Sequence, residues 1–252
     1  MDKWEQHLAD YQSLLKEIFE TRGGNLRFGR KVVAASDVAE QFFCERKVEM
    51  QYLHGEIETE AKMVGTEAHE KLLEGSVQVE REQLWQRIYG RIPVFALEAL
   101  FFAKFDDVIV AGKPDSVLFR NGLPLVVLEH KFSKKMVDYE TYHIQARIYG
   151  LLLNNIGFDT KHLFYAIIVA DPAYRYDDSL SRKAMEAIDK NGPKEGVFDL
   201  ANARVFFCKY NQGDAEKDLK WAVKFWRQER EAVATQNPNK CKTCEYHEKC
   251  QG

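Results

Sequence analysis

The segment from Leu123 to Phe132, LPLVVLEHKF, limits the possible folds of this chain more than any other. Its apolar, β-branched run has the length and composition of a strand buried in a sheet. Glu129 and Lys131 lie two positions apart within it, so their side chains project from the same face of that strand. Because burying two charges costs several kcal/mol per ion unless partners compensate, the segment predicts a site with further polar residues.

Asp115, at the start of the preceding apolar run DSVLF, is the natural partner for this pair. A two-residue turn at Asn121-Gly122 would put Asp115 out of register with Glu129, which would then face the other way. A third loop residue, or a bulge near Pro114, sets the two carboxylates opposite each other. We therefore expect an irregularity in this hairpin.

The resulting pattern, an aspartate followed by Glu-x-Lys, has two chemical interpretations. In one, the carboxylates hold a hard divalent cation, and the lysine orients or activates the water that attacks a scissile phosphate. In the other, the residues form a salt bridge at a strand end beside a turn aspartate, since motifs this short recur by chance. The metal-site interpretation is favoured by the order of the motifs along the chain. His69 lies on a predicted helix upstream of Asp115 and Glu-x-Lys, and Gln145 and Tyr149 lie at i and i+4 of a predicted helix downstream.

Apolar spacing along the chain predicts alternating helices and strands. Residues 94–132 have the pattern of three antiparallel strands, and the polar stretch before residue 91 has no predicted element. Further strands are predicted at HLFYAIIVA and ARVFFCKY. Helices are predicted at residues 4–19, 36–52, 56–73, 139–155, 181–190 and 214–234. The mixed order predicts an α/β fold whose mixed, partly antiparallel central sheet is flanked by helices.

Charge and hydropathy narrow the function less than the motifs do. The formal net charge of -3 gives no overall basic field, so it neither indicates nor excludes a nucleic-acid partner. The first residues contain no apolar leader, and no eighteen uncharged apolar residues run together. We expect a cytoplasmic protein with no membrane partner.

The spacing Cys241-x2-Cys244-x5-Cys250 near the C-terminus predicts a metal centre, because a reducing cytoplasm disfavours disulfides. A tetrahedral zinc site or an iron-sulfur cluster needs a fourth ligand. Cys208 lies in an apolar strand pattern and is most simply a small buried hydrophobe, so we expect Cys44 to be that ligand. The centre would tie the two ends of the chain together. Iron, zinc and uncoordinated thiols all remain open on spacing alone.

With these residues the chain resembles the CRISPR-associated RecB-like iron-sulfur exonucleases of the PD-(D/E)xK nuclease superfamily, over about residues 36–250. The resemblance implies a restriction-endonuclease-like core with an iron-sulfur subdomain made from N- and C-terminal parts. The implied segments are a helical extension at 1–35, a helical region at 36–92, a nuclease core at 93–236 and a cysteine-rich tail at 237–252. The implied site residues are the metal ligands His69, Asp115, Glu129 and the His130 carbonyl, the catalytic Asp115, Glu129 and Lys131, the DNA-contacting Gln145 and Tyr149, and the cluster ligands Cys44, Cys241, Cys244 and Cys250.

The resemblance also implies a function and its cofactors. It implies a metal-dependent exonuclease for single-stranded DNA or DNA ends that trims spacer precursors, working with the CRISPR integrase complex and compatible with a homo-oligomer. The cofactors are a 4Fe-4S cluster, with 2Fe-2S or zinc as alternatives, and Mn²⁺ or Mg²⁺; the imidazole ligand favours Mn²⁺. A stand-alone repair or recombination nuclease and a non-catalytic DNA-end-binding scaffold are the alternative functions.

Two features depart from that family. Residue 130 is a histidine where an apolar or aromatic residue is usual, and the helix within residues 1–35 has no counterpart there. By strand parity we expect the His130 side chain to face away from the metal.

Overall fold

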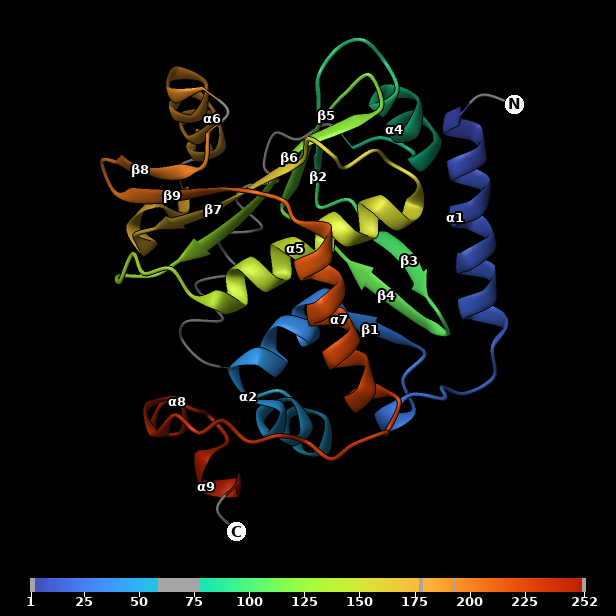
Figure 1. Ribbon diagram of the computed structural model, residues 1–252, viewed down its shortest axis with the longest axis vertical. Coiled ribbons are helices and arrows are strands. Elements are labelled where there is room, and N and C mark those ends of the chain that lie inside the picture. The colour runs from blue at the N-terminus through green and yellow to red at the C-terminus, as the bar shows by residue number, and fades with distance from the viewer. Residues whose placement is uncertain (1–2, 59–77, 177–178, 193, 251–252) are drawn as a thin grey trace.

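The computed structural model describes residues 3–58, 78–176, 179–192 and 194–250, and within them two sheets surrounded by helices (Figure 1). The helices are α1 Lys3–Glu20, α2 Ala35–His54, α4 Arg81–Ile88, α5 Glu140–Ile156, α6 Leu180–Asn191, α7 Gln212–Trp226, α8 Pro238–Lys242 and α9 His247–Cys250, with 3-10 turns at Arg27–Gly29 and Pro172–Tyr176. The strands are β1 Val32–Ala34, β2 Val94–Leu97, β3 Phe101–Phe105, β4 Val108–Gly112, β5 Ser116–Arg120, β6 Leu123–Phe132, β7 Phe164–Ala170, β8 Gly196–Leu200 and β9 Ala203–Lys209. The helix predicted at 56–73, which carries His69, lies almost wholly outside the described residues.

The strands form a six-stranded sheet in the order β2-β5-β6-β7-β9-β8 and a three-stranded sheet in the order β1-β4-β3. The pairs β6-β7 and β1-β4 are parallel, and the other pairs are antiparallel. Two consecutive parallel strands need a crossover connection, which α5 provides between β6 and β7. This confirms the predicted mixed, partly antiparallel sheet flanked by helices.

Helix α5 is the centre of the molecule, because it packs against strands of both sheets and against α2 and α7 (Figure 1). Its buried face includes Ile144, Ile148 and Leu152. At the end of β4, a Cβ atom added to Gly112 would lie 2.5 Å from Cδ1 of Leu152 and 2.8 Å from the ring of Tyr149. Glycine is therefore required where the chain leaves the small sheet for the large one beside α5.

The six-stranded sheet has a buried layer on each face. Along β6, Val127 packs in the core around α5, whereas Val126 and Leu128 pack in a second core that α6 covers. Side chains alternate along a strand, so Glu129 and Lys131 project toward α5 and His130 projects toward α6.

Several elements differ from the sequence prediction. Five strands, β2 to β6, occupy the segment where three were expected. The first expected strand is divided at Glu98, which has a φ of 43°, and the second is divided at residues 113–115, where the chain passes from one sheet to the other. Helix α4 occupies the stretch that the sequence predicted to be without structure, and its Trp85 and Ile88 are buried. Strand β8 was not predicted, and α7 ends at Trp226 instead of continuing to about residue 234.

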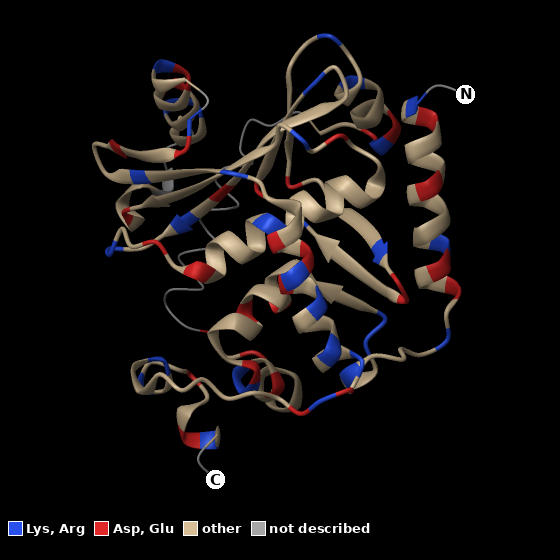
Figure 2. Ribbon diagram, in the orientation of Figure 1, with Lys and Arg blue, Asp and Glu red and all other residues tan. Residues whose placement is uncertain are grey.

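The N-terminal helix α1 packs on α4, α5 and β3 and buries His7, Leu8 and Tyr11. Tyr11 donates a hydrogen bond to the carbonyl of Leu100 (3.1 Å). Along α1 and α7, acidic and basic residues are interspersed, as Figure 2 shows. Among the described residues, no helix has the length and apolar character needed to span a membrane.

Candidate active site

A pocket of about 450 Å³ lies where the two sheets meet the N-terminal half of α5. Its lining includes five residues predicted to act in catalysis or DNA binding: Asp115, Glu129, Lys131, Gln145 and Tyr149. They come from the residue just before β5, the end of β6 and one face of α5. Residues separated by up to 34 positions in sequence therefore share one cavity.

The hairpin of β5 and β6 contains the irregularity that the sequence required. The turn at Asn121-Gly122 has two residues, and it sets Arg120 opposite Leu123. The register then shifts between Leu118 and Phe119, which pair with Val126 and Pro124, so Leu125 is the extra residue of a bulge.

Beyond this bulge, Ser116 pairs with Leu128, and the next step along both strands brings Asp115 level with Glu129. The expected irregularity is confirmed. Its expected position was wrong, because the bulge lies within β6 and neither near Pro114 nor in the turn.

Lys131 connects the strand pair to α5. Its Nζ donates to Oε1 of Glu129 (2.8 Å) and to Oε1 of Gln145 (3.0 Å). Burial disfavours the charged ammonium, but Glu129, and to a lesser degree Asp115, outweigh burial and raise the pKa of Lys131 above its ordinary value. These carboxylates favour the charged ammonium, so Lys131 is a cationic hydrogen-bond donor in this arrangement.

Gln145 and Tyr149 continue this chain of hydrogen bonds. Gln145 Nε2 donates to the Tyr149 hydroxyl (2.6 Å), which donates to the carbonyl of Lys113 (3.4 Å). Burial, together with the charge of Glu129, raises the pKa of Tyr149 well above its ordinary value, so the phenol stays neutral. The two residues thus fix the orientation of Lys131.

Asp115 is held from the side of the sheet opposite α5. The backbone N–H of His130 donates to Asp115 Oδ2 (2.6 Å), and Nδ1 of the same histidine lies 3.3 Å from that oxygen. The other ring nitrogen, Nε2, lies 3.0 Å from the hydroxyl of Ser181 on α6. Strand parity does place the ring on the α6 side, but it still contacts Asp115, and nothing in the sequence indicated Ser181.

Two carboxylates on a pocket wall offer hard oxygen ligands, which suit Mg²⁺ or Mn²⁺. Both are largely buried, since Asp115 is 9% and Glu129 2% exposed. The third predicted side-chain ligand, His69, lies outside the described residues. Within the described ranges, no three His, Cys, Asp or Glu side chains are grouped so that they could hold a metal ion.

The four predicted cluster cysteines come from distant parts of the chain and line one cavity of about 80 Å³: Cys44, Cys241, Cys244 and Cys250. Cys44 interrupts α2, where its φ of -172° and ψ of 119° are extended. The N–H of Thr235 donates to Cys44 Sγ (3.4 Å). Cys208 is not in this lining, and its Sγ lies 3.9 Å from Nδ1 of His143. As the side chains of the described residues lie, these thiols do not form a metal-binding group.

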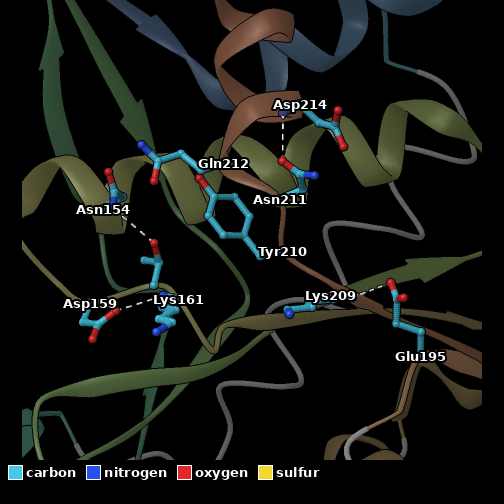
Figure 3. Close-up of a pocket in the computed structure, with 10 residues that line it drawn as sticks. Asn154, Asp159, Lys161, Glu195, Lys209, Tyr210, Asn211, Gln212 and Asp214 are labelled. Atoms are coloured by element: carbon cyan, nitrogen blue, oxygen red, sulfur yellow. Dashed lines mark hydrogen bonds between the residues drawn. The ribbon is translucent and has the colours of Figure 1, made fainter.

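A larger pocket, of about 700 Å³, lies at the end of β9 and the start of α7 (Figure 3). Its lining mixes both signs of charge, with Asp159 and Glu195 beside Lys161 and Lys209. Glu195 accepts a hydrogen bond from the backbone N–H of Lys209 (2.9 Å). The lining contains none of the predicted site residues, so pocket size does not locate the chemistry here.

Three comparisons with known proteins bear on the family of this chain, and only the match to a family model identifies it. A search of curated proteins found no match. Among solved structures, one described as "Crystal structure of SSO0001" is 13% identical, covers 96% of this chain and 92% of that chain, and superposes with a TM-score of 0.48. The family model of the PD-(D/E)XK nuclease superfamily matches residues 13–251. Because this match spans nearly the whole chain, the protein belongs to the PD-(D/E)XK nuclease superfamily.

Proposed function

We propose that this nuclease degrades DNA from free or single-stranded ends with the help of a divalent metal. Its sequence resembles the CRISPR-associated RecB-like iron-sulfur exonucleases, which act in this way. Members of the superfamily are typically metal-dependent nucleases, which supports the coarse assignment. The observation that carries the proposal is the single pocket shared by Asp115, Glu129 and Lys131. The CRISPR integrase complex is the proposed partner.

The proposed metal ligands are Asp115, Glu129, the His130 carbonyl and His69, with Mn²⁺ or Mg²⁺ as the ion. When bound there, the ion would polarise the scissile phosphate and acidify the attacking water. Lys131 is a fixed cationic donor beside these carboxylates, so it would orient that water and stabilise the charge that develops on the phosphate. Gln145 and Tyr149 hold Lys131 in place from α5, and because they line the pocket they are the proposed DNA contacts.

An assay that compares linear with covalently closed DNA tests the proposal. With Mn²⁺ present, end-labelled linear single strands should be shortened stepwise, whereas closed single-stranded circles of the same sequence should stay intact. The Glu129→Gln protein should leave both intact, because it loses a ligand charge while keeping the side-chain shape. Cutting of circles at the same rate would contradict end-dependence, and DNA binding without any cleavage would support the scaffold alternative.

The shared cavity of the four cysteines supports a proposed iron-sulfur cluster that joins α2 to the C-terminal helices. Protein purified without oxygen should contain iron and absorb visible light, and Cys44→Ser and Cys241→Ser should lose both signals. Cys208→Ser is the matched control, since its sulfur lies on β9 outside that cavity, and it should retain iron. Colourless protein that contains zinc would overturn the iron assignment, and full iron in Cys44→Ser would overturn the fourth ligand.

A further inference from the structure

His130 is buried on the side of β6 that faces α6, with 2% of its surface exposed. It lies between two polar side chains, Asp115 in the pocket wall and Ser181 near the start of α6. The core around it is apolar, and Leu128 and Ile168 in that layer are fully buried. A buried imidazole in such a layer requires hydrogen-bond partners, and these two residues supply them.

The chemistry of the three groups fixes the direction of the hydrogen bonds. A metal-binding Asp115 would be ionised, and an ionised aspartate only accepts, so His130 Nδ1 would carry the proton that is donated to Asp115 Oδ2. In the neutral ring, Nε2 is then an acceptor, and the Ser181 hydroxyl donates to it. Together with the backbone N–H of residue 130, this gives Oδ2 two donors from a single residue.

We propose that His130 and Ser181 are positioning residues that hold the Asp115 carboxylate for the divalent metal and so make metal affinity depend on α6. This inference rests on the proposed metal site. His130 engages Oδ2 through two donors and so fixes the orientation of the carboxylate, whose residue lines the pocket. Ligand-orienting partners of this kind typically change metal affinity by about 10-fold to 100-fold.

The placement of α6 explains why the effect reaches beyond the pocket. Helix α6 packs through Leu180, Ala184 and Ile188 on the face of the sheet away from α5. Ser181 is next to the first of these anchors, so the hydroxyl position is set by helix packing. Asp115 is thereby supported by two elements, β6 and α6. Glu129 and Lys131 are the residues of β6 that line the pocket, and among the described residues none from α6 lines it.

Direct Mn²⁺ binding, measured by electron paramagnetic resonance of the free ion, tests the proposal without relying on cleavage. His130→Leu should weaken binding by about 10-fold or more, because leucine fills the apolar layer with a side chain of similar size but removes both side-chain contacts. His130→Asn should recover part of the loss, since its amide can donate from the position of Nδ1. Ser181→Ala should weaken binding by a smaller factor. Asn191→Ala is the control on the same helix, because it removes only a hydrogen bond to the Ala187 carbonyl (2.7 Å), and it should bind like wild type.

Wild-type affinity in both His130→Leu and Ser181→Ala would overturn the proposal, as would an Asn variant no better than Leu. If His130→Leu does not fold, the Mn²⁺ affinity of Ser181→Ala, compared with that of Asn191→Ala, tests the proposal instead. Asp115→Asn separates this inference from the proposed function. If that variant binds Mn²⁺ as wild type does, the metal site itself is wrong; if it loses binding while the His130 and Ser181 variants do not, only the positioning role is wrong.

Discussion

Replacing Lys131 with alanine is expected to lower the rate of DNA cleavage on the order of 10²–10³-fold, the loss typical of removing one preorganised donor to a developing negative charge. The ammonium of Lys131 is held by Glu129 and Gln145 before any substrate arrives, so it needs no reorganisation when the phosphate reacts. Single-turnover cleavage of end-labelled single-stranded DNA at saturating Mn²⁺ measures the change. The fall should be in kcat, with KM for DNA much less affected.

The fold should survive this change, because the Lys131 side chain is 22% exposed at the pocket and water can reach the carboxylate it leaves. Lys104→Ala is the matched control, since Lys104 also forms an ion pair, with Glu17 (2.5 Å), but on β3 and away from the pocket. Both proteins should melt within a few degrees of wild type. A Lys131→Ala protein that cuts at the wild-type rate would mean that the lysine is only the salt-bridge partner of Glu129.

Much of this site follows from strand geometry alone. The two-residue period puts Glu129 and Lys131 on one face, and the requirement that Asp115 join them predicts a hairpin irregularity. The sequence could not locate it, because Leu125 has no feature that marks it as a bulge residue. His69 lies outside the described residues and stays a prediction.

Other features could not be predicted because distant residues impose them. Nothing in the local sequence marks Cys44 as the break in α2; there the N–H of Glu45 leaves the helical pattern and donates to the carbonyl of Val233 (3.1 Å). The contact of His130 with Ser181 joins residues 51 positions apart and likewise has no local signature. Helix α4 is equally hard to predict, because it has eight residues and only three of them are apolar, Leu84, Trp85 and Ile88.

The largest loss of stability is expected from Glu45→Ala, at about 3–5 kcal/mol of the free energy of unfolding, as for other buried ion pairs that lose one partner. Glu45 is fully buried. Its carboxylate accepts from both terminal nitrogens of Arg230, from Gln41 (2.7 Å) and from the backbone N–H of Val233 (2.8 Å). Removing it leaves the Arg230 guanidinium without its main counter-charge.

These contacts hold the segment 227–237, here called the strap, which runs from α7 past α2 to α8 (Figure 1). Arg230 also stacks over the ring of Trp221, with 4.4 Å between guanidinium carbon and ring centroid. Because Thr235 on the strap donates to Cys44 Sγ, a loosened strap should expose that thiol. Urea unfolding measures the stability, and the rate at which a thiol reagent modifies Cys44 in cluster-free protein in native buffer measures the exposure.

The control for the strap is Glu231→Ala, because that side chain is 94% exposed. Its ion pair with Arg27 is long, at 4.0 Å, and a surface pair of this kind contributes little to stability. Its stability should stay within about 0.5 kcal/mol of wild type. Glu45→Gln keeps the shape and one acceptor oxygen but not the charge, so it should fall between Glu45→Ala and wild type. If Glu45→Ala lost no more stability than Glu231→Ala, the strap would be held by its apolar contacts, and the break at Cys44 would need no ion pair to maintain it.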